Sequence, residues 1–321
     1  MERTNRRIAC VHIGSHKTGT SAIQKSLYFS KLEENNYLYP VSILSKGFSH
    51  NNLALSILYN RHKDLDHYLY YLEKEIKNNK NNIIISSEIL EKLIFIKKDK
   101  ILKFLILLKN YFSEIRIIYS IRNEPDLCDS VFKQRVCSKE YYYKEETKTF
   151  INEFFNEDFS YNKTIDSWID TNLISSSYVY WYSDNFLENI NNFKQACELE
   201  IEIPDPGIVN PSIEGKILEL AYFYNKNIKD DNVVKILKSL QLNLCDKWKY
   251  KKTILSEQEY DLYKNSFTEK KWHPSCVLLN NKPNKKYAKE KFNSITKNEA
   301  IEYLIELYQD TNLLELFKII I

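Results

Sequence analysis

The sequence predicts an α/β fold with three layers, in which helices flank a central, mostly parallel sheet. Short β-branched runs alternate with longer segments whose apolar residues recur at helical spacing, and a glycine-containing loop joins the first strand to the first helix. Long crossovers of this kind favour parallel strands. The 321 residues, 43% of them hydrophobic, are enough for one large core. We predict a single domain, with an α/β core over 1–200 and a helix-rich extension over 201–321.

The strands of this core are short runs rich in isoleucine, valine and tyrosine. They are expected at 8–13, 83–87, 115–120 and 177–182, with a short strand or extended turn at 37–40. Helices are expected at 22–32, from 49 or 51 to 58, and at 64–77, 99–112, 145–155, 161–171 and 185–197, with another that starts near Pro125.

The extension is predicted to be helical at 214–224, 256–267 and 298–318. Its lysine-rich run, 282–291, is typical of a solvated face, and the alternative is a surface that holds an anionic nucleotide or acceptor.

Charge and cysteine usage limit the partners and the compartment. A net charge of +3 is too small to indicate nucleic acid as a main partner. The six cysteines are scattered without metal-ligand spacing, so we expect no metal and a reducing compartment. The apolar runs are too short to span a membrane, and residues 1–7 do not lead into a signal segment. These observations predict a cytoplasmic protein.

The loop after the first strand has the chemistry of an anion site. It contains two of the five glycines in the chain, Gly14 and Gly19, which suggests a backbone conformation or a ligand approach that a Cβ would prevent. Backbone N–H groups in such a loop, with the positive end of the following helix, attract phosphate or sulfate. One cation and three hydroxyls are added by the side chains of Lys17, Thr18, Thr20 and Ser21.

The position of the lysine distinguishes this loop from the G-x-x-x-x-G-K-[ST] loop of nucleotide hydrolases. Here Thr20 follows the second glycine, and the lysine stands two residues before that glycine. The run Lys17-Thr18-Gly19-Thr20-Ser21 resembles the K-T-G-T-[ST] loop of sulfotransferases that use 3′-phosphoadenosine-5′-phosphosulfate (PAPS). The resemblance implies that residues 16–21 cradle the 5′-phosphosulfate and that Lys17 neutralises charge on the leaving group. The family usually has proline where this chain has His16.

A second motif follows the third strand. Arg122 lies at the predicted carboxyl end of that strand, the edge where ligands bind in open α/β sheets. Ser130 comes eight residues later, about two turns into the next helix. Sulfotransferases show this spacing, and the resemblance implies that both side chains bind the 3′-phosphate of PAPS. Weaker matches to bacterial sulfotransferases of the carbohydrate-modifying type extend the resemblance over roughly the first two thirds of the chain.

The resemblance implies in-line transfer of a sulfuryl group from PAPS to a hydroxyl or amine, most simply of a carbohydrate, without a metal. Catalysis then depends on positioning, on charge stabilisation and on a base that takes the acceptor's proton. Glu88 is our first candidate because it follows the second strand at the ligand-binding edge, and His50, at the start of a helix, is the second. A helix cap at Glu88 and an ordinary loop position for His50 are the alternatives. Trp181 or Tyr182 is a candidate for stacking on adenine, with a core position as the alternative.

Two other classes of protein stay open. An NTP-dependent kinase or hydrolase requires Gly-Lys-Ser/Thr in the loop and a strand-end aspartate for magnesium, and the second and third predicted strands end without one. The other class is a non-catalytic nucleotide-binding protein of the same fold. The presence of Lys17, Arg122 and Ser130 argues against this class. The sequence contains no motif that identifies the acceptor.

Overall fold

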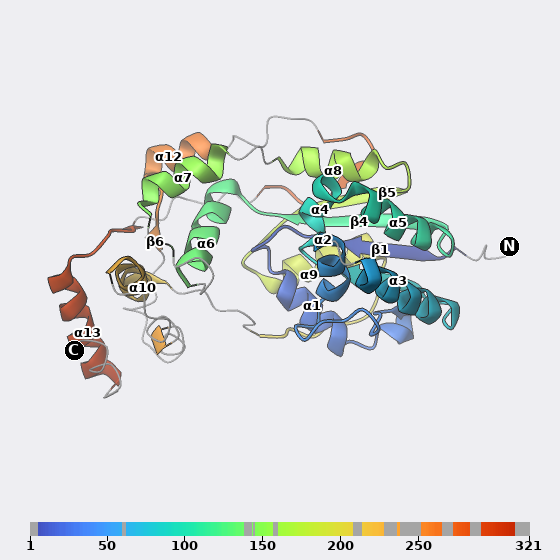
Figure 1. Cartoon of the computed structure of the whole chain (residues 1–321), viewed down its shortest axis with the longest axis horizontal. Helices are drawn as coiled ribbons and strands as arrows, with labels where there is room; N and C mark the ends of the chain where they lie inside the picture. Colours follow the sequence, from blue (N-terminus) through green and yellow to red (C-terminus); the bar gives the residue numbers. More distant parts are fainter. Residues whose placement is uncertain are drawn as a thin grey trace. The chain divides into compact units, whose positions relative to one another are not determined.

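A computed structural model describes residues 6–59, 62–137, 143, 145–156, 160–207, 214–227, 236–237, 252–264, 272–282 and 290–311. The chain divides into two compact units (Figure 1). The first comprises Met1–Asn123, Phe159–Val209 and Thr268–Pro283, and the second comprises Glu124–Asp158, Asn210–Phe267 and Asn284–Ile321. The two units therefore interleave along the chain, whereas the sequence suggested one division near residue 200.

A six-stranded parallel sheet forms the centre of the first unit, with strand order β2-β3-β1-β4-β5-β7. The strands are β1 (Ile8–His12), β2 (Tyr37–Leu38), β3 (Asn82–Ser86), β4 (Glu114–Ile121), β5 (Ser176–Trp181) and β7 (Cys276–Leu278). His12 of β1 lies opposite Ser86 of β3 and Ile118 of β4. The carboxyl ends of these three central strands therefore meet at one edge of the sheet.

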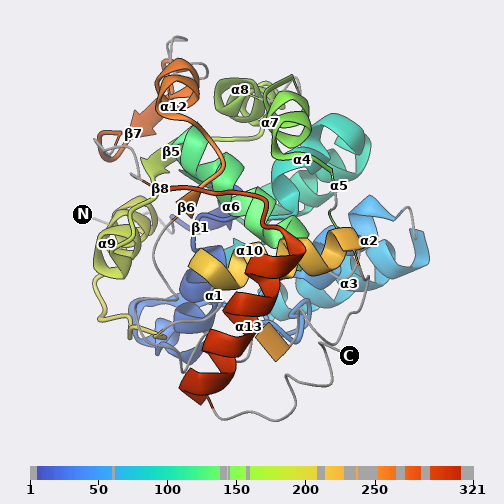
Figure 2. The ribbon, with the colours of Figure 1, turned by 90° about the vertical axis from the view of Figure 1, so that its left-hand side faces the viewer.

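Helices cover both faces of this sheet, which confirms the predicted three-layer α/β fold. Figure 2 shows α1 (Thr20–Phe29) and α9 (Phe186–Cys197) on one side and α4, α5 and α8 on the other. The latter side holds α2 (Asn51–Leu58), α3 (His62–Lys77), α4 (Leu90–Ile96), α5 (Lys98–Lys109) and α8 (Tyr161–Ile169). One apolar cluster lies between these two helices and the sheet. It includes Ile23 and Leu27 of α1, Ile190 and Phe193 of α9, and the strand residues Cys10, Ile118 and Tyr180.

Local sequence explains where several of these helices begin. Asn185 caps α9 by accepting a hydrogen bond from the backbone N–H of Leu187 at 2.9 Å. Ser160 accepts from the N–H of Lys163 and so caps α8. A 3₁₀ turn, η1 (Leu32–Asn35), follows α1. Neither α4 nor β7 was expected from the sequence.

The second unit packs helices around aromatic side chains. Its elements are α6 (Glu124–Cys137), α7 (Thr147–Asn156), α10 (Gly215–Asn227), α12 (Glu257–Tyr263), α13 (Lys297–Thr311) and the parallel pair β6 (Lys252–Thr253) and β8 (Glu290–Lys291). The ring of Phe132 lies 5.4 Å from that of Phe150, 5.8 Å from Tyr222 and 5.3 Å from Phe292, between ring centroids. The contacts with Phe150 and Phe292 are edge-on, and such contacts stabilise an aromatic core beyond the area they bury.

The predicted helices of the extension correspond to α10, α12 and α13. Residues 265–267 and 312–318 of those predictions lie outside the described residues, as do residues 283–289 of the lysine-rich run. In the described parts of the chain, no helix combines the length and apolar composition that crossing a bilayer requires.

Candidate anion-binding site

The loop between β1 and α1 turns through two residues in the left-handed region. Lys17 has a φ of 66° and Gly19 a φ of 72°. A left-handed conformation is uncommon for a residue other than glycine and often marks a functional segment. Left-handed residues in a tight turn direct successive N–H groups towards a common side, as in the nests that bind anions. The predicted loop therefore has a backbone suited to an anion.

Four consecutive amides of the loop are available to a ligand. Among the described residues, the backbone N–H groups of Thr18, Gly19, Thr20 and Ser21 have no protein acceptor. They stand at the amino end of α1, where helix amides lack partners within the helix and the helix dipole is positive. The first turn of α1 contains no acidic residue. These donors and this field favour a phosphate or sulfate group.

The loop side chains differ in their orientation. The hydroxyl of Thr18 is buried: it donates to the carbonyl of Ser15 at 2.5 Å and lies 2.8 Å from Ser120 Oγ. Of the three hydroxyls expected to face the anion, that of Thr18 is therefore used inside the protein, and only the amide of Thr18 is available. Lys17 and Ser21 are half-buried, and His16 is exposed.

Gly14 is required by close packing below the loop. A Cβ on Gly14 would lie 2.5 Å from Ser120 Oγ, 2.6 Å from Thr20 Cγ2 and 2.8 Å from His12 Nε2. All three neighbours are buried side chains that cannot move aside without disturbing the core. The glycine therefore permits the loop to lie close to the end of β4.

We expect Gly14→Ala to destabilise the protein by about 1–3 kcal/mol, the usual cost of overpacking, and to weaken anion binding by displacing the loop. Urea denaturation measures the first effect. The matched control is Gly47→Ala, because a Cβ on Gly47 would meet nothing within 4 Å. Equal stability of the two variants would contradict the close packing at Gly14.

Glu88 lies just beyond the end of β3, where two helices hold its carboxylate. Its Oε2 accepts from Gln24 Nε2 of α1 at 3.1 Å, and its Oε1 accepts from Asn51 Nδ2 of α2 at 3.5 Å. Gln24, which is 1% exposed, also donates to Ser86 Oγ at 3.2 Å. Since Gln24 belongs to the helix that follows the loop, Glu88 is oriented by the same element that presents the loop amides.

The charges around the loop change the pKa of His16. Loss of solvation lowers the pKa of His16; the carboxylate of Glu88 opposes this change, and the positive charges of Lys92 and Lys17 add to it. His16 and Lys17 of the loop, Glu88 after β3 and Lys92 of α4 therefore interact electrostatically.

His50 is held in a structural position. Its side chain is fully buried; Nδ1 accepts from the backbone N–H of Ser86 at 2.8 Å, and Nε2 lies 3.0 Å from the carbonyl of Pro40, to which it donates. Burial lowers the pKa of His50 to about 3. Both ring nitrogens are occupied by backbone groups, so this structure offers no nitrogen of His50 to an acceptor's proton.

Arg122 follows β4 at the same edge and contacts the loop directly. Its Nη1 donates to the carbonyl of Lys17 at 2.8 Å, and its guanidinium lies over the ring of Tyr182, 5.0 Å from the centroid. The carbonyl of Arg122 accepts from the hydroxyl of Tyr161 at 2.8 Å. A Cβ on Gly19 would lie 2.9 Å from Tyr182 Cε2, so the loop also packs closely on this ring.

Two other predicted residues have different environments. Ser130 belongs to α6 in the second unit and is 8% exposed. Trp181, a candidate for stacking on adenine, is buried at the end of β5 in a core position.

Two buried ionisable side chains near the loop were not predicted. Glu91 of α4 is 1% exposed and accepts from the hydroxyl of Tyr119 at 2.5 Å, while the Ser15 side chain and the His16 backbone also interact with its carboxyl. Burial raises the pKa of Glu91 to about 7, against the opposing effect of these donors. His12, fully buried, has Nδ1 2.9 Å from Ser86 Oγ, and its Nε2 has no partner among the described residues.

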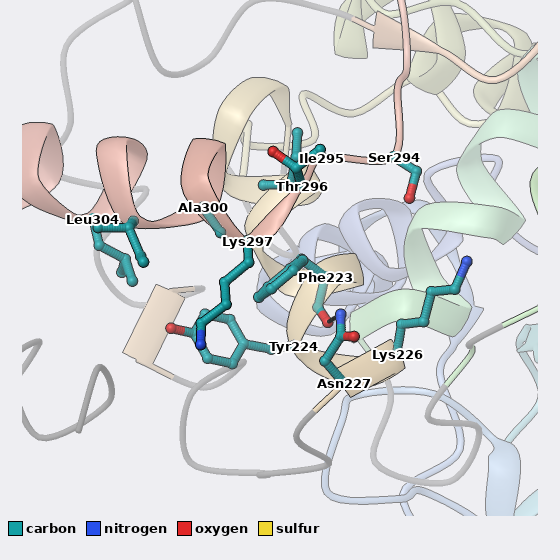
Figure 3. Close-up of a pocket in the computed structure, with 11 residues that line it drawn as sticks. Phe223, Tyr224, Lys226, Asn227, Ser294, Ile295, Thr296, Lys297, Ala300 and Leu304 are labelled. Carbon is teal, nitrogen blue, oxygen red and sulfur yellow. Dashed lines mark hydrogen bonds between the residues drawn. The ribbon is translucent and has the colours of Figure 1, made fainter.

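A cavity of about 500 Å³ lies in the second unit, between α10 and the segment that leads into α13 (Figure 3). Its lining includes Phe223, Tyr224, Asn227, Thr296 and Lys297. Aromatic rings with a few amide, hydroxyl and ammonium groups are typical of sites for small polar ligands.

Comparison with known proteins does not place the chain in a family. No family model and no curated protein matches it. Among solved structures, it is similar to a chain from a study of the PezAT chromosomal toxin–antitoxin system of Streptococcus pneumoniae, with 13% identity over 73% of this chain and 88% of that chain and a TM-score of 0.31. A likeness at this TM-score indicates neither a shared fold nor a shared function.

Proposed function

We propose that this protein is a PAPS-dependent sulfotransferase that moves a sulfuryl group to a hydroxyl or amine of an acceptor. The observation that carries the proposal is the loop of residues 16–21: its sequence resembles the PAPS loop, it turns through left-handed Lys17 and Gly19, and it presents four amides at the start of α1. This donor set suits a phosphosulfate, because unbonded amides at the positive end of a helix, with a lysine in the same loop, can stabilise the charge that develops in the transfer.

In the proposed reaction, Lys17 and the loop amides stabilise the charge that forms on the departing phosphate. Arg122 and Ser130 bind the 3′-phosphate, Ser130 on the resemblance alone. Glu88 takes the proton of the acceptor, since Gln24 and Asn51 hold its carboxylate at the edge of the sheet that carries the loop. We assign the base to Glu88 rather than to His50, whose ring nitrogens are both bonded to the backbone.

The test of the donor site is binding of adenosine 3′,5′-bisphosphate (PAP) measured by calorimetry. We expect PAP to bind without magnesium and much more tightly than ATP with magnesium, because the loop lacks the Gly-Lys-Ser/Thr order that serves a nucleoside triphosphate and its metal. ATP·Mg binding as tight as that of PAP would favour the kinase or hydrolase class.

A transfer assay separates an enzyme from a non-catalytic nucleotide-binding protein. Labelled PAPS offered to glycan and lipid fractions of the source cell should label a hydroxylated acceptor, and we propose a carbohydrate as that acceptor. Binding of PAP with no transfer to any fraction would favour the non-catalytic class. A cytoplasmic location is part of the proposal and rests on the scattered cysteines.

A further inference from the structure

The carboxyl of Glu91 is an unusual neighbour for an anion site. It belongs to α4 on the face of the sheet opposite α1, has almost no exposure, and interacts with Ser15 and His16, which begin the loop. A negative charge at this position opposes a phosphate or sulfate on the amides of Thr18 to Ser21. Because the carboxyl is buried, solvent and salt screen this repulsion only weakly.

We propose that Glu91 takes up a proton from the solvent when the loop binds its anion. This inference rests on the proposed function, because it takes PAPS or PAP as the ligand. Without ligand, Tyr119, Ser15 and His16 stabilise the carboxylate. An anion on the loop favours the neutral acid, since a like charge nearby disfavours ionisation. The protonated carboxyl still has lone pairs that accept from Tyr119, so the contact at 2.5 Å persists.

The surroundings of Glu91 give it a charge that changes near neutral pH. Its pKa of about 7 leaves it partly ionised there. Helix α2 has no ionisable side chain, and the buried residues of α5 are all apolar. Glu88, one turn earlier, is bonded to Gln24 and Asn51. Among the described residues, the ionisable groups that act on it are Tyr119 of β4 and Lys92 of α4, while His16 contacts it through the backbone. Helix α8, which packs on α4, adds Tyr161, which acts on Tyr119, and the half-buried Asp166.

The sign of the pH dependence follows from linkage. Anion binding raises the pKa of Glu91 above its free value of about 7, so tighter binding is fully present below pH 7 and is lost as pH rises through the raised pKa. Above pH 7 the phosphates of PAP are already dianionic and add little pH dependence of their own. We expect the affinity for PAP to fall about 2.5- to sixfold between pH 6.5 and pH 8.5, which corresponds to a pKa shift of about half a unit to one unit.

Calorimetry with PAP tests this directly on the full chain. Titrations at pH 7.5 in PIPES and in Tris, which differ in ionisation enthalpy, should give different apparent enthalpies that correspond to uptake of about a quarter to half a proton per PAP bound. Glu91→Gln should abolish this difference and bind PAP at pH 8.5 about as tightly as at pH 6.5. Tyr119→Phe removes a donor to the carboxylate, so proton uptake should reach its maximum at higher pH.

The control is Glu75→Gln, since Glu75 of α3 is a hydrogen-bonded carboxylate away from the loop that accepts from the backbone amides of Val41 and Ser42. It should behave as the unmodified protein does. Equal enthalpies in both buffers from pH 6.5 to 8.5, or unchanged proton uptake in Glu91→Gln, would overturn the inference alone. The two-buffer result for the unmodified chain decides the question even if Glu91→Gln does not fold. No binding of PAP at any pH would overturn the proposed function and this inference with it.

Discussion

Replacing Glu88 by glutamine is expected to slow sulfuryl transfer by about 10²–10⁴-fold, the usual contribution of a general base. Glutamine keeps the size of the side chain and has an oxygen that accepts from Gln24, but it cannot accept the acceptor's proton. The affinity for PAP should stay nearly unchanged or rise slightly, because the described hydrogen bonds of Glu88 go to Gln24 and Asn51 and the substitution removes a negative charge beside the loop. Single-turnover rates with the labelled acceptor measure the first effect, and calorimetry measures the second.

His50→Asn serves as the comparison for this prediction. It breaks contacts with the amide of Ser86 and the carbonyl of Pro40 in the core, so it should lower the free energy of unfolding. The folded fraction should retain most of its transfer rate. Near-normal turnover in Glu88→Gln together with loss of turnover in folded His50→Asn would reverse the two roles.

Arg122→Ala should weaken PAP binding by about 30- to 150-fold, which corresponds to the loss of a charge-assisted contact of about 2–3 kcal/mol. Adenosine 5′-phosphosulfate, which lacks the 3′-phosphate, should lose much less affinity. Part of the loss will be common to both ligands, because Arg122 Nη1 also donates to the carbonyl of Lys17. Calorimetry with the two ligands separates the phosphate contact from this support of the loop.

Tyr161→Phe is the matched control for Arg122. It removes the hydroxyl that donates to the Arg122 carbonyl but leaves the guanidinium and its place over Tyr182. We expect a small loss that is equal for both ligands. If Arg122→Ala also weakened both ligands equally, Arg122 would be a structural residue of the loop and would not bind the 3′-phosphate.

Local patterns predicted most of the sheet and its edge. The strands β1, β3, β4 and β5 are apolar runs with distinct ends, and the loop after β1 has its glycines and lysine within a few residues. Among the described elements, those that escaped prediction are all short, namely η1, α4, β6, β7 and β8. Helix α4 has seven residues and follows directly after a strand, and β7 has three, so neither is long enough to show a period.

The environment of the site residues was less predictable than their positions. Glu91 stands among apolar residues of α4, where a lone acid would be expected on the surface, and its burial depends on Tyr119, 28 residues along the chain. The role of His50 was hard to predict for the opposite reason, because its residue type suggests a function that its surroundings do not allow. Its type suggests a proton acceptor, and only the folded chain places Ser86 and Pro40 against its two nitrogens.

The interleaving of the two units determines how the chain can be divided. A fragment that ends near residue 200 would lose β7 and leave the edge of β5 unpaired, and an unpaired edge invites aggregation. It would also separate α6 and α7 from Tyr222 and Phe292, which complete the aromatic core around Phe132. Each unit depends on contacts between distant segments, so both are expected to fold slowly and only once most of the chain is available. Neither unit can be isolated by a single cut, and preparing either one alone would require joining its three segments with new linkers.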